Sequence, residues 1–344
     1  MFLPDYTSIT ATGTRSGPAR RLVVLVQGPN PTVEYYFSRR LEGLNHVTVK
    51  MTTNPASVGL EDGDYLLACR YLPPRWWRFL HKPSVRLAGA GIFFDDDYVA
   101  MVRDRNLPMH YRAHIFGSGL FPLRTFRQRW TDVFVSTEEL ADRFAGAHPK
   151  LFPPIPRERD FGVAAQRDVK GRGRVAFHAQ LSHIKDHELA ASVWSAVCAR
   201  TETYELDVIG PKVLAGVWRG LPNVRFRSEL DWQAYEATTA AEGADLLIAP
   251  LFDTVLNRAR ASTKAIDAVR MRAAALFPML EPYACLQDIA PMLGDRPDDW
   301  AQEIITIMQD GARRRQLAED LRQRVSQWRD RGRNPLADLF ESVT

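Results

Sequence analysis

The stretch GADLLIAPLFDTVLNRARASTKAIDAVRMRAAALFPMLEPY, residues 243–283, decides the predicted fold. It opens with a short apolar run, residues 244–250, of the kind that forms a buried strand in a parallel sheet. Polar residues follow at 253–263, and the spacing over 264–275 is helical before a strand that ends in proline. Ligands of open α/β sheets bind at the carboxyl ends of the strands. The stretch therefore predicts a strand, a ligand-binding loop and a helix.

The same alternation of short apolar runs and helical segments continues in both directions from this stretch. It is typical of doubly wound parallel sheets. The predicted strands before the middle of the chain are residues 21–27, 46–51, 64–69, 85–94 and 131–137, and those after it are 175–178, 204–209 and 224–226. Ser136 or Thr137 is expected to cap the helix that begins at Glu138.

The length of 344 residues exceeds one ordinary core and fits two domains of about 150 residues. Three prolines at residues 151–157 and the sequence GRGR at 171–174 place the predicted boundary between residues 152 and 172. We expect Rossmann-like domains at residues 1–165 and 166–315, followed by a helical, charged segment at 316–344.

Composition places the chain among globular proteins, since 45% of its residues are hydrophobic and 25% are charged. No apolar run approaches the roughly 20 residues that span a bilayer. The amino terminus has no basic region followed by an apolar one, so we expect a cytoplasmic protein. Cys69, Cys198 and Cys285 are widely spaced without a CxxC pair, which argues against a disulfide framework or a structural zinc site.

Charge is unevenly distributed along the chain. Residues 1–165 hold 21 Lys and Arg against 16 Asp and Glu, whereas the remainder holds 24 against 25. A basic first domain suits an anionic acceptor or peripheral contact with an anionic membrane, and a solvated Arg-rich surface is the alternative. Trp76 and Trp77 beside Arg75 and Arg78 are candidates for a lipid-contacting patch, or for one core Trp and one exposed Trp. No nucleic-acid module is present, and we expect no such partner.

Residues 178–188, HAQLSHIKDHE, follow a predicted strand and open a helix. Phosphates bind at such helix starts, where backbone N–H groups and the helix dipole favour an anion, and Lys185 adds a charge. Gly28, after the first strand, allows close approach of the backbone to a ligand. The sequence contains no GxGxxG fingerprint, Walker loop or GxSxG elbow.

Two segments resemble the donor-binding segments of retaining GT-B glycosyltransferases, especially a branch of glycosyltransferase family 4. One resembles the run APL.D..FN.AKS.IK.LE, and the other resembles G..SH.KD.EL, although His178 stands where a small residue is common. The matching residues are Ala249, Pro250, Leu251, Asp253, Asn257, Arg258, Ser262, Lys264 and Asp267 in the first, and Ser182, His183, Lys185, Asp186 and Glu188 in the second.

The resemblance implies a GT-B fold, with two Rossmann-like doubly wound parallel-sheet domains facing a central cleft. Residues 1–165 would bind the acceptor, residues 166–315 the nucleotide-sugar donor, and the helices of 316–344 would cross back to the first domain. The implied activity is transfer of a sugar, with retention, to a hydroxyl of a saccharide or lipid-linked acceptor. No cofactor is expected.

The resemblance also implies roles for single residues in the donor site. Lys185 and Lys264 would contact the diphosphate, with His183 lining the same pocket. Asp267 would accept hydrogen bonds from the ribose. Arg258 or Arg260 is a further candidate for the phosphates, and Ser262 and Gly28 complete the predicted donor-binding set.

One family position departs from the pattern. The family usually has two glutamates with seven residues between them, and Asp267 occupies the second position while Ala259 occupies the first. The carboxylate expected beside the sugar is therefore absent, and Asn257 with Lys264 are the candidates to replace it. The alternative is a non-catalytic nucleotide-sugar-binding partner of an active transferase.

Asp95, Asp96 and Asp97 follow the predicted strand GIFF, and three carboxylates at a strand end need compensating cations or hydrogen bonds. As a DxD motif, Asp95 and Asp97 would hold Mn²⁺ or Mg²⁺ in a metal-dependent, single-domain GT-A-like transferase. The run also resembles the Y..DDD segment of the family 4 branch, which needs no metal. In that case one aspartate would face the acceptor hydroxyl or donor sugar, and the others would cap the following turn.

Overall fold

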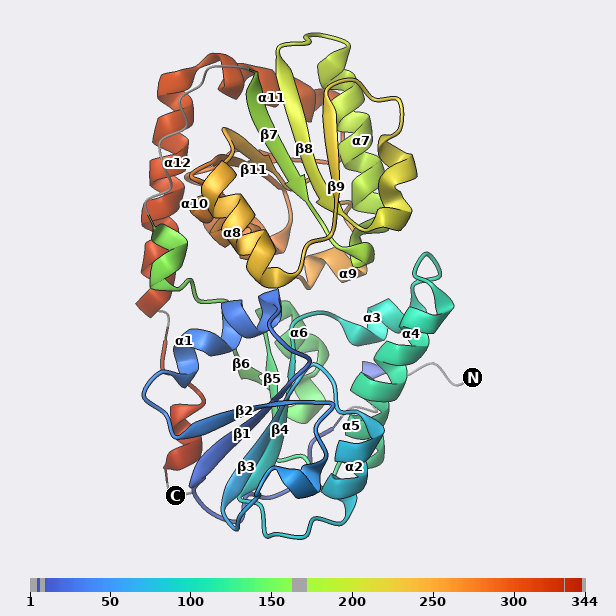
Figure 1. Cartoon of the computed structure of the whole chain (residues 1–344), viewed down its shortest axis with the longest axis vertical. Helices are drawn as coiled ribbons and strands as arrows, with labels where there is room; N and C mark the ends of the chain where they lie inside the picture. Colours follow the sequence, from blue (N-terminus) through green and yellow to red (C-terminus); the bar gives the residue numbers. More distant parts are fainter. Residues whose placement is uncertain (1–4, 7–9, 163–171, 331, 342–344) are drawn as a thin grey trace. The chain divides into compact units, whose positions relative to one another are not determined.

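The computed structural model describes residues 5–6, 10–162, 172–330 and 332–341, which form two compact units (Figure 1). The first unit comprises the described residues of Met1–Ile155, Ala259–Ala261 and Gly332–Thr344. The second comprises those of Pro156–Arg258 and Ser262–Arg331. Each unit contains a six-stranded parallel sheet with helices, so the predicted doubly wound α/β class is confirmed.

The sheet of the first unit has the order β2-β1-β3-β4-β5-β6. Side chains of β3 and β4 are buried along their whole length, because a strand covered on both faces is apolar throughout. The order reverses between β1 and β3, and this switch point is where such sheets bind ligands. The strands are β1 (Arg21–Val26), β2 (His46–Lys50), β3 (Asp64–Cys69), β4 (Gly89–Phe94), β5 (Asp132–Val135) and β6 (Lys150–Leu151).

Helices of the first unit are short. Thr137 caps α6, since its Oγ1 accepts a hydrogen bond from the Leu140 N–H at 3.3 Å, as predicted. The helical segment after β1 begins as a π-helical turn, Val33–Phe37, before α1. The helices are α1 (Ser38–Leu41), α2 (Pro74–His81), α3 (Tyr98–Arg103), α4 (Met109–Ile115), α5 (Phe121–Thr125) and α6 (Glu138–Arg143), with a second π-helical turn at Phe116–Leu120 and short 3-10 turns at Pro55–Ser57, Ala145–Ala147 and Ala337–Phe340.

The described residues 332–341 pack on the rest of this first unit. The Ala19 N–H donates to the Leu339 carbonyl at 2.7 Å, and Asn334 Nδ2 donates to the Arg40 carbonyl at 2.7 Å. Arg40 itself is buried over the Phe152 ring, 4.2 Å from its centroid, and burial lowers the pKa of Arg40 to about 10.

The sheet of the second unit has the order β12-β11-β10-β7-β8-β9. Counted along the chain from its own first strand, this is the order 3-2-1-4-5-6 of Rossmann folds, with its switch point between β7 and β10. The strands are β7 (Gly173–His178), β8 (Tyr204–Gly210), β9 (Val224–Ser228), β10 (Leu246–Ile248), β11 (Ala274–Pro278) and β12 (Met292–Leu293).

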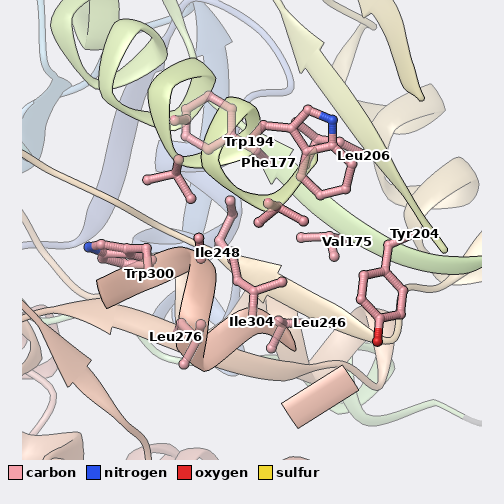
Figure 2. Close-up of a cluster of buried hydrophobic side chains, with 14 of the residues drawn as sticks. Val175, Phe177, Trp194, Tyr204, Leu206, Leu246, Ile248, Leu276, Trp300 and Ile304 are labelled. Atoms are coloured by element: carbon pink, nitrogen blue, oxygen red, sulfur yellow. The ribbon is translucent and has the colours of Figure 1, made fainter. Parts of the chain in front are cut away.

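Helices cover both faces of this second sheet. Val175 and Phe177 of β7 point into a cluster that Trp194 of α7 and Trp300 of α11 complete (Figure 2). The next side chain, His178, contacts Tyr235 of α8 instead, because successive side chains of a strand point to opposite faces. The helices are α7 (Ile184–Cys198), α8 (Trp232–Glu242), α9 (Val255–Arg258), α10 (Thr263–Met271), α11 (Pro297–Gln309) and α12 (Gly311–Ser326), with 3-10 turns at Glu158–Phe161, Leu181–His183, Lys212–Trp218, Glu281–Leu286 and Gln327–Asp330.

Several bounds of the predicted elements are wrong. The strand expected over residues 85–94 begins at Gly89, and the one expected over 131–137 is limited to Asp132–Val135. The helix expected over residues 264–275 ends at Met271, because Arg272 adopts the left-handed conformation (φ 54°, ψ 33°), and β11 begins at Ala274. The strand expected over residues 244–250 is limited to Leu246–Ile248. Among the helices of the described residues, none has both the length and the apolar character needed to cross a membrane.

Candidate functional site

At the switch point of the second unit, Asp186 links the segment after β7 to the segment after β10. Asp186 lies in the first turn of α7 and is 2% exposed. Asp186 Oδ1 accepts hydrogen bonds from the Phe252 N–H at 3.1 Å and from Asn257 Nδ2 at 3.0 Å. Its Oδ2 lies 2.8 Å from His183 Nδ1. The predicted site residues His183 and Asn257 thus meet on one carboxylate, which fixes the loop after β10 against the start of α7.

Lys185 is exposed in the same first turn of α7, as its predicted role requires. The helix is 15 residues long, and its N-cap residue, His183, makes no side-chain capping hydrogen bond. Its first N–H groups and the Lys185 ammonium together favour an anion at this position.

Lys264 begins a second charged group, on α10. Its Nζ lies 2.9 Å from Asp267 Oδ2, and Asp267 Oδ1 accepts from Arg270 Nη2 at 3.1 Å. Arg270 Nε donates in turn to Asp160 Oδ1 at 3.2 Å. The side chain of Asp267 is 5% exposed, against 25% for Lys264, so the lysine is the accessible member of the group.

A buried polar chain extends from Asp267 into the unit. Burial and the neighbouring Asp267 carboxylate raise the pKa of Tyr235 well above its ordinary value. The Tyr235 hydroxyl lies 3.3 Å from His178 Nδ1, and His178 Nε2 lies 3.5 Å from Asp207 Oδ2. Burial lowers the pKa of His178, so this imidazole is neutral near pH 7. Sequence reasoning noted His178 only as a departure and missed Tyr235, because nothing in their spacing shows that β7 and α8 bring them together.

The other predicted donor-site residues differ in exposure. Arg258 is exposed and paired in a bidentate manner with Asp253, at 2.5 and 2.7 Å. Ser262 is buried at the N-cap of α10 and makes no side-chain capping bond. Gly28 lies after β1 with a φ of 146°, where an added Cβ would meet no atom within 4 Å. Gly28 belongs to the first unit, whereas the other predicted donor-site residues belong to the second.

In the first unit, the carboxyl ends of β3 and β4 carry a polar cluster. Asp95 Oδ2 accepts from Thr32 Oγ1 at 2.6 Å, and its Oδ1 lies 3.3 Å from Arg70 Nε. Arg70 also donates to the Tyr98 hydroxyl at 3.0 Å and has a φ of 76°, which is costly for a residue with a side chain. Sequence reasoning missed Arg70 and Tyr98, because backbone strain at an arginine leaves no signal in the sequence.

The other two aspartates have different surroundings. Asp97 is fully buried; it caps α3 by accepting from the Ala100 N–H at 2.8 Å, and it also binds Tyr6 and Arg143. Asp96 Oδ1 lies 3.4 Å from Arg260 Nη1. Burial raises the pKa of Asp96, and Arg260 acts in the opposite direction. Each of the three carboxylates thus has its own arginine.

Ala259, which replaces the expected first glutamate, is fully buried in the first unit. Its carbonyl accepts a hydrogen bond from Thr137 Oγ1 at 3.0 Å. The backbone is therefore fixed at this position, and the side chain supplies no polar group.

No protein-family model and no curated protein sequence matches the chain. Solved structures do match. A structure from E. coli, described as trehalose-6-phosphate bound with UDP-2-fluoro glucose, has a TM-score of 0.61 at 10% identity, over 94% of this chain and 99% of that one. A structure from work on trehalose-6-phosphate synthase and glycosyltransfer with retention has a TM-score of 0.53 at 12% identity, over 81% and 74%. A mutant of S. aureus TarM in complex with Fondaparinux, alpha-GlcNAc-glycerol and UDP has a TM-score of 0.54 at 9% identity, over 81% and 54%.

The chain has a GT-B-like fold. It shares this fold with retaining glycosyltransferases, and identities near 10% show the fold alone. The alternative of a single-domain GT-A-like fold is wrong, because the described residues form two separate six-stranded sheets.

Proposed function

We propose that the protein transfers a sugar from a nucleotide-sugar donor to a hydroxyl of a saccharide or lipid-linked acceptor, with retention. The observation that carries the proposal is the switch point of the second unit. There Asp186 fixes the loop after β10 against α7, next to the first turn of this helix and the exposed Lys185. Similarity to a structure bound with UDP-2-fluoro glucose supports the same class of donor.

In this proposal the second unit binds the donor diphosphate. The N–H groups at the start of α7, Lys185 and Lys264 stabilise the negative charge that develops on the leaving diphosphate. Asp267 holds Lys264 in place, at 2.9 Å. The contact between Asp267 and the ribose stays a prediction, since both oxygens of this carboxylate already have cationic partners.

Of the three aspartates, Asp96 suits the acceptor hydroxyl best. Asp97 is used as a helix cap, and Asp95 is bound by Thr32 and Arg70. Asp96 keeps partial exposure, and its raised pKa makes it a better proton acceptor than an ordinary carboxylate. We assign it the role of facing the acceptor hydroxyl.

The buried Ala259 favours a second candidate, a nucleotide-sugar-binding partner that does not catalyse transfer. It would use the same switch point without turnover. The two candidates differ in whether nucleoside diphosphate is released.

The test is a thermal-shift screen of the full chain with a panel of nucleotide sugars, followed by an assay of released nucleoside diphosphate with saccharide and lipid-linked acceptors. Thermal stabilisation of the protein together with release of nucleoside diphosphate supports the transferase, and stabilisation without release supports the binding partner.

Lys264→Gln should weaken donor binding by about tenfold or more, the effect of losing a charge-assisted hydrogen bond. Arg272→Gln, an exposed cation at the other end of α10, is the matched control and should bind normally. If no nucleotide sugar stabilises the protein, both candidates are wrong.

The variant Asp96→Asn distinguishes donor binding from sugar transfer. It should still show the thermal shift with the donor, because Asp96 lies in the first unit, and it should lose most of the release. Normal release from Asp96→Asn would remove this residue from the proposed mechanism.

A further inference from the structure

Two long segments of the first unit contain no acidic residue. Residues 65–94 and 105–131 together hold ten Lys and Arg and no Asp or Glu. With 41 acidic residues in a chain of 344, segments of this combined length would on average hold about seven. The first segment includes α2 and the second includes α4 and α5. Four of the ten cations lie on these helices: Arg75, Arg78, Arg112 and Arg124.

Helices α2 and α5 lie side by side through an aromatic cluster (Figure 1). The Trp77 ring stacks on Phe126 at 5.7 Å between centroids and meets Phe121 edge-on at 5.9 Å. His81 lies 5.5 Å from Phe126. The Trp77 and Phe126 side chains are partly exposed, whereas the neighbouring Trp76 is fully buried in the core. Of the two predicted alternatives for this tryptophan pair, the core position holds for Trp76, whereas Trp77 is packed within the aromatic cluster and only partly exposed.

Exposed cations surround the cluster. Arg78 lies over the Trp77 ring, 5.6 Å from its centroid, and Lys82 follows the end of α2. Arg124 lies in the last turn of α5 and Arg127 just beyond it, both exposed. We call α2, α5 and these four cations the basic aromatic surface. Trp and Phe rings at a rim of Lys and Arg are the pattern of proteins that lie on an anionic lipid surface.

Nucleic acid is the other polyanion that such a surface attracts. Binding of single strands needs aromatic faces on which bases stack. The Trp77 ring already stacks on Phe126 on one side and has Arg78 over it, so its faces are largely occupied. An anionic membrane needs only charge and shallow aromatic contact, and both are present here.

We propose that the basic aromatic surface docks the protein on an anionic phospholipid membrane. The proposal is independent of catalysis, because it concerns α2 and α5 and none of the residues assigned to the donor or to Asp96. It gives the basic first unit a partner and is consistent with a lipid-linked acceptor.

The test is co-sedimentation of the full chain with phospholipid vesicles. Binding is expected with vesicles that contain phosphatidylglycerol beside phosphatidylcholine, little binding with phosphatidylcholine alone, and release at high salt. The double variant Arg124→Gln/Arg127→Gln should lower the partition coefficient by at least about tenfold. The matched control Lys212→Gln/Arg219→Gln removes two exposed cations from the second unit and should bind as the parent does.

Thermal melts of both double variants check that they fold, since all four side chains are exposed. If the two double variants lost vesicle binding equally, total charge and not the basic aromatic surface would govern binding, and the proposal would be overturned. Equal binding to both kinds of vesicle, or binding to a single-stranded oligonucleotide without binding to phosphatidylglycerol, would also overturn it. Failure of the nucleotide-sugar screen would leave these outcomes unchanged, so the two proposals fail separately.

Discussion

At the scale of single residues, Asp160 is a buried carboxylate that binds two arginines of the second unit. It is 1% exposed, and its Oδ1 accepts hydrogen bonds from Arg157 Nη2 at 2.7 Å and from Arg270 Nε at 3.2 Å. Asp160→Asn leaves two buried guanidinium groups short of a partner, and it should lower the free energy of unfolding by about 3 kcal/mol near neutral pH. Urea unfolding measures the loss. Asp295→Asn, at an exposed position, is the control and should change stability by less than about 0.5 kcal/mol.

The loss at Asp160 should depend on pH. Burial alone would raise the pKa of Asp160, but Arg157 and Arg270 outweigh it and lower this pKa below its ordinary value. A carboxyl with a depressed pKa in the folded state stabilises the protein above its unfolded pKa, about 3.9, and loses that contribution as pH falls through the folded value. The difference between parent and Asp160→Asn should therefore be constant down to about pH 5 and shrink below about pH 4. If the parent and Asp160→Asn differed in free energy of unfolding by the same amount above about pH 5 and below about pH 4, the charge of Asp160 would not be the cause.

The sequence predicted several residues of the candidate site, and the reasons are local. His183 and Lys185 lie at the start of the helix that follows β7, and Asn257 lies in the first helix after β10, so the position of each could be inferred from its own strand and helix. Asp186, which joins His183 to Asn257, was visible only as a motif match, because its partners are 66 and 71 residues away. The strained Arg70 and the His178–Tyr235 contact could not be inferred, since they depend on backbone angle and on packing between distant elements.

At the scale of elements, the end of α10 shows a correctable strain. Arg272 follows the last turn in the left-handed conformation, where glycine is favoured because it has no Cβ. Arg272→Gly should raise the free energy of unfolding by about 0.5 to 1 kcal/mol, visible as a higher melting temperature. Arg272→Ala removes the same side chain but keeps the Cβ, so it should give no such gain. Equal effects of the two substitutions would show that the backbone conformation is not the cause.

Strand β4 shows the opposite case, a glycine that packing requires. A Cβ at Gly91 would lie 2.6 Å from the Tyr65 hydroxyl and 2.9 Å from a ring carbon of Phe134. Gly91→Ala should therefore cost about 1 to 3 kcal/mol of stability by overpacking. At Gly117 an added Cβ meets nothing within 4 Å, so Gly117→Ala is the matched control and should be neutral or slightly stabilising. Chemical denaturation of the two variants compares them, and a Gly91→Ala protein as stable as its control would contradict the packing.

The elements that the sequence predicted best are the buried strands, because strands covered on both faces are continuous apolar runs. Strand β3 was predicted with both ends correct. The two-residue strands β6 and β12 were not predicted, since so short a segment has no period to detect. The end of α10 was misplaced because the apolar spacing continues through Ala273 into β11, and only the angle at Arg272 separates them.

At the scale of the whole molecule, two sheets of different strand order divide the proposed work. The first has the order 2-1-3-4-5-6 and the second 3-2-1-4-5-6, and each offers polar groups where its order reverses. The sequence predicted this architecture, since two series of alternating strands and helices are visible without any knowledge of how the strands pair. The strand orders themselves were not predicted, because pairing between parallel strands depends on contacts between distant parts of the chain.

The division predicts where a donor changes the protein's dynamics. The nucleoside diphosphate with the largest thermal shift should slow hydrogen exchange in the first turn of α7 and in the loop from β10 to α9, because its phosphates would bind there and oppose local opening. The amides of α2 and α5 should exchange at the same rate with and without it, since they belong to the basic aromatic surface of the first unit. Exchange measured on the full chain, with Lys264→Gln as the control of reduced binding, makes the comparison. Protection confined to the first unit would place the nucleotide at the switch point between β1 and β3 and reverse the proposed assignment of donor and acceptor.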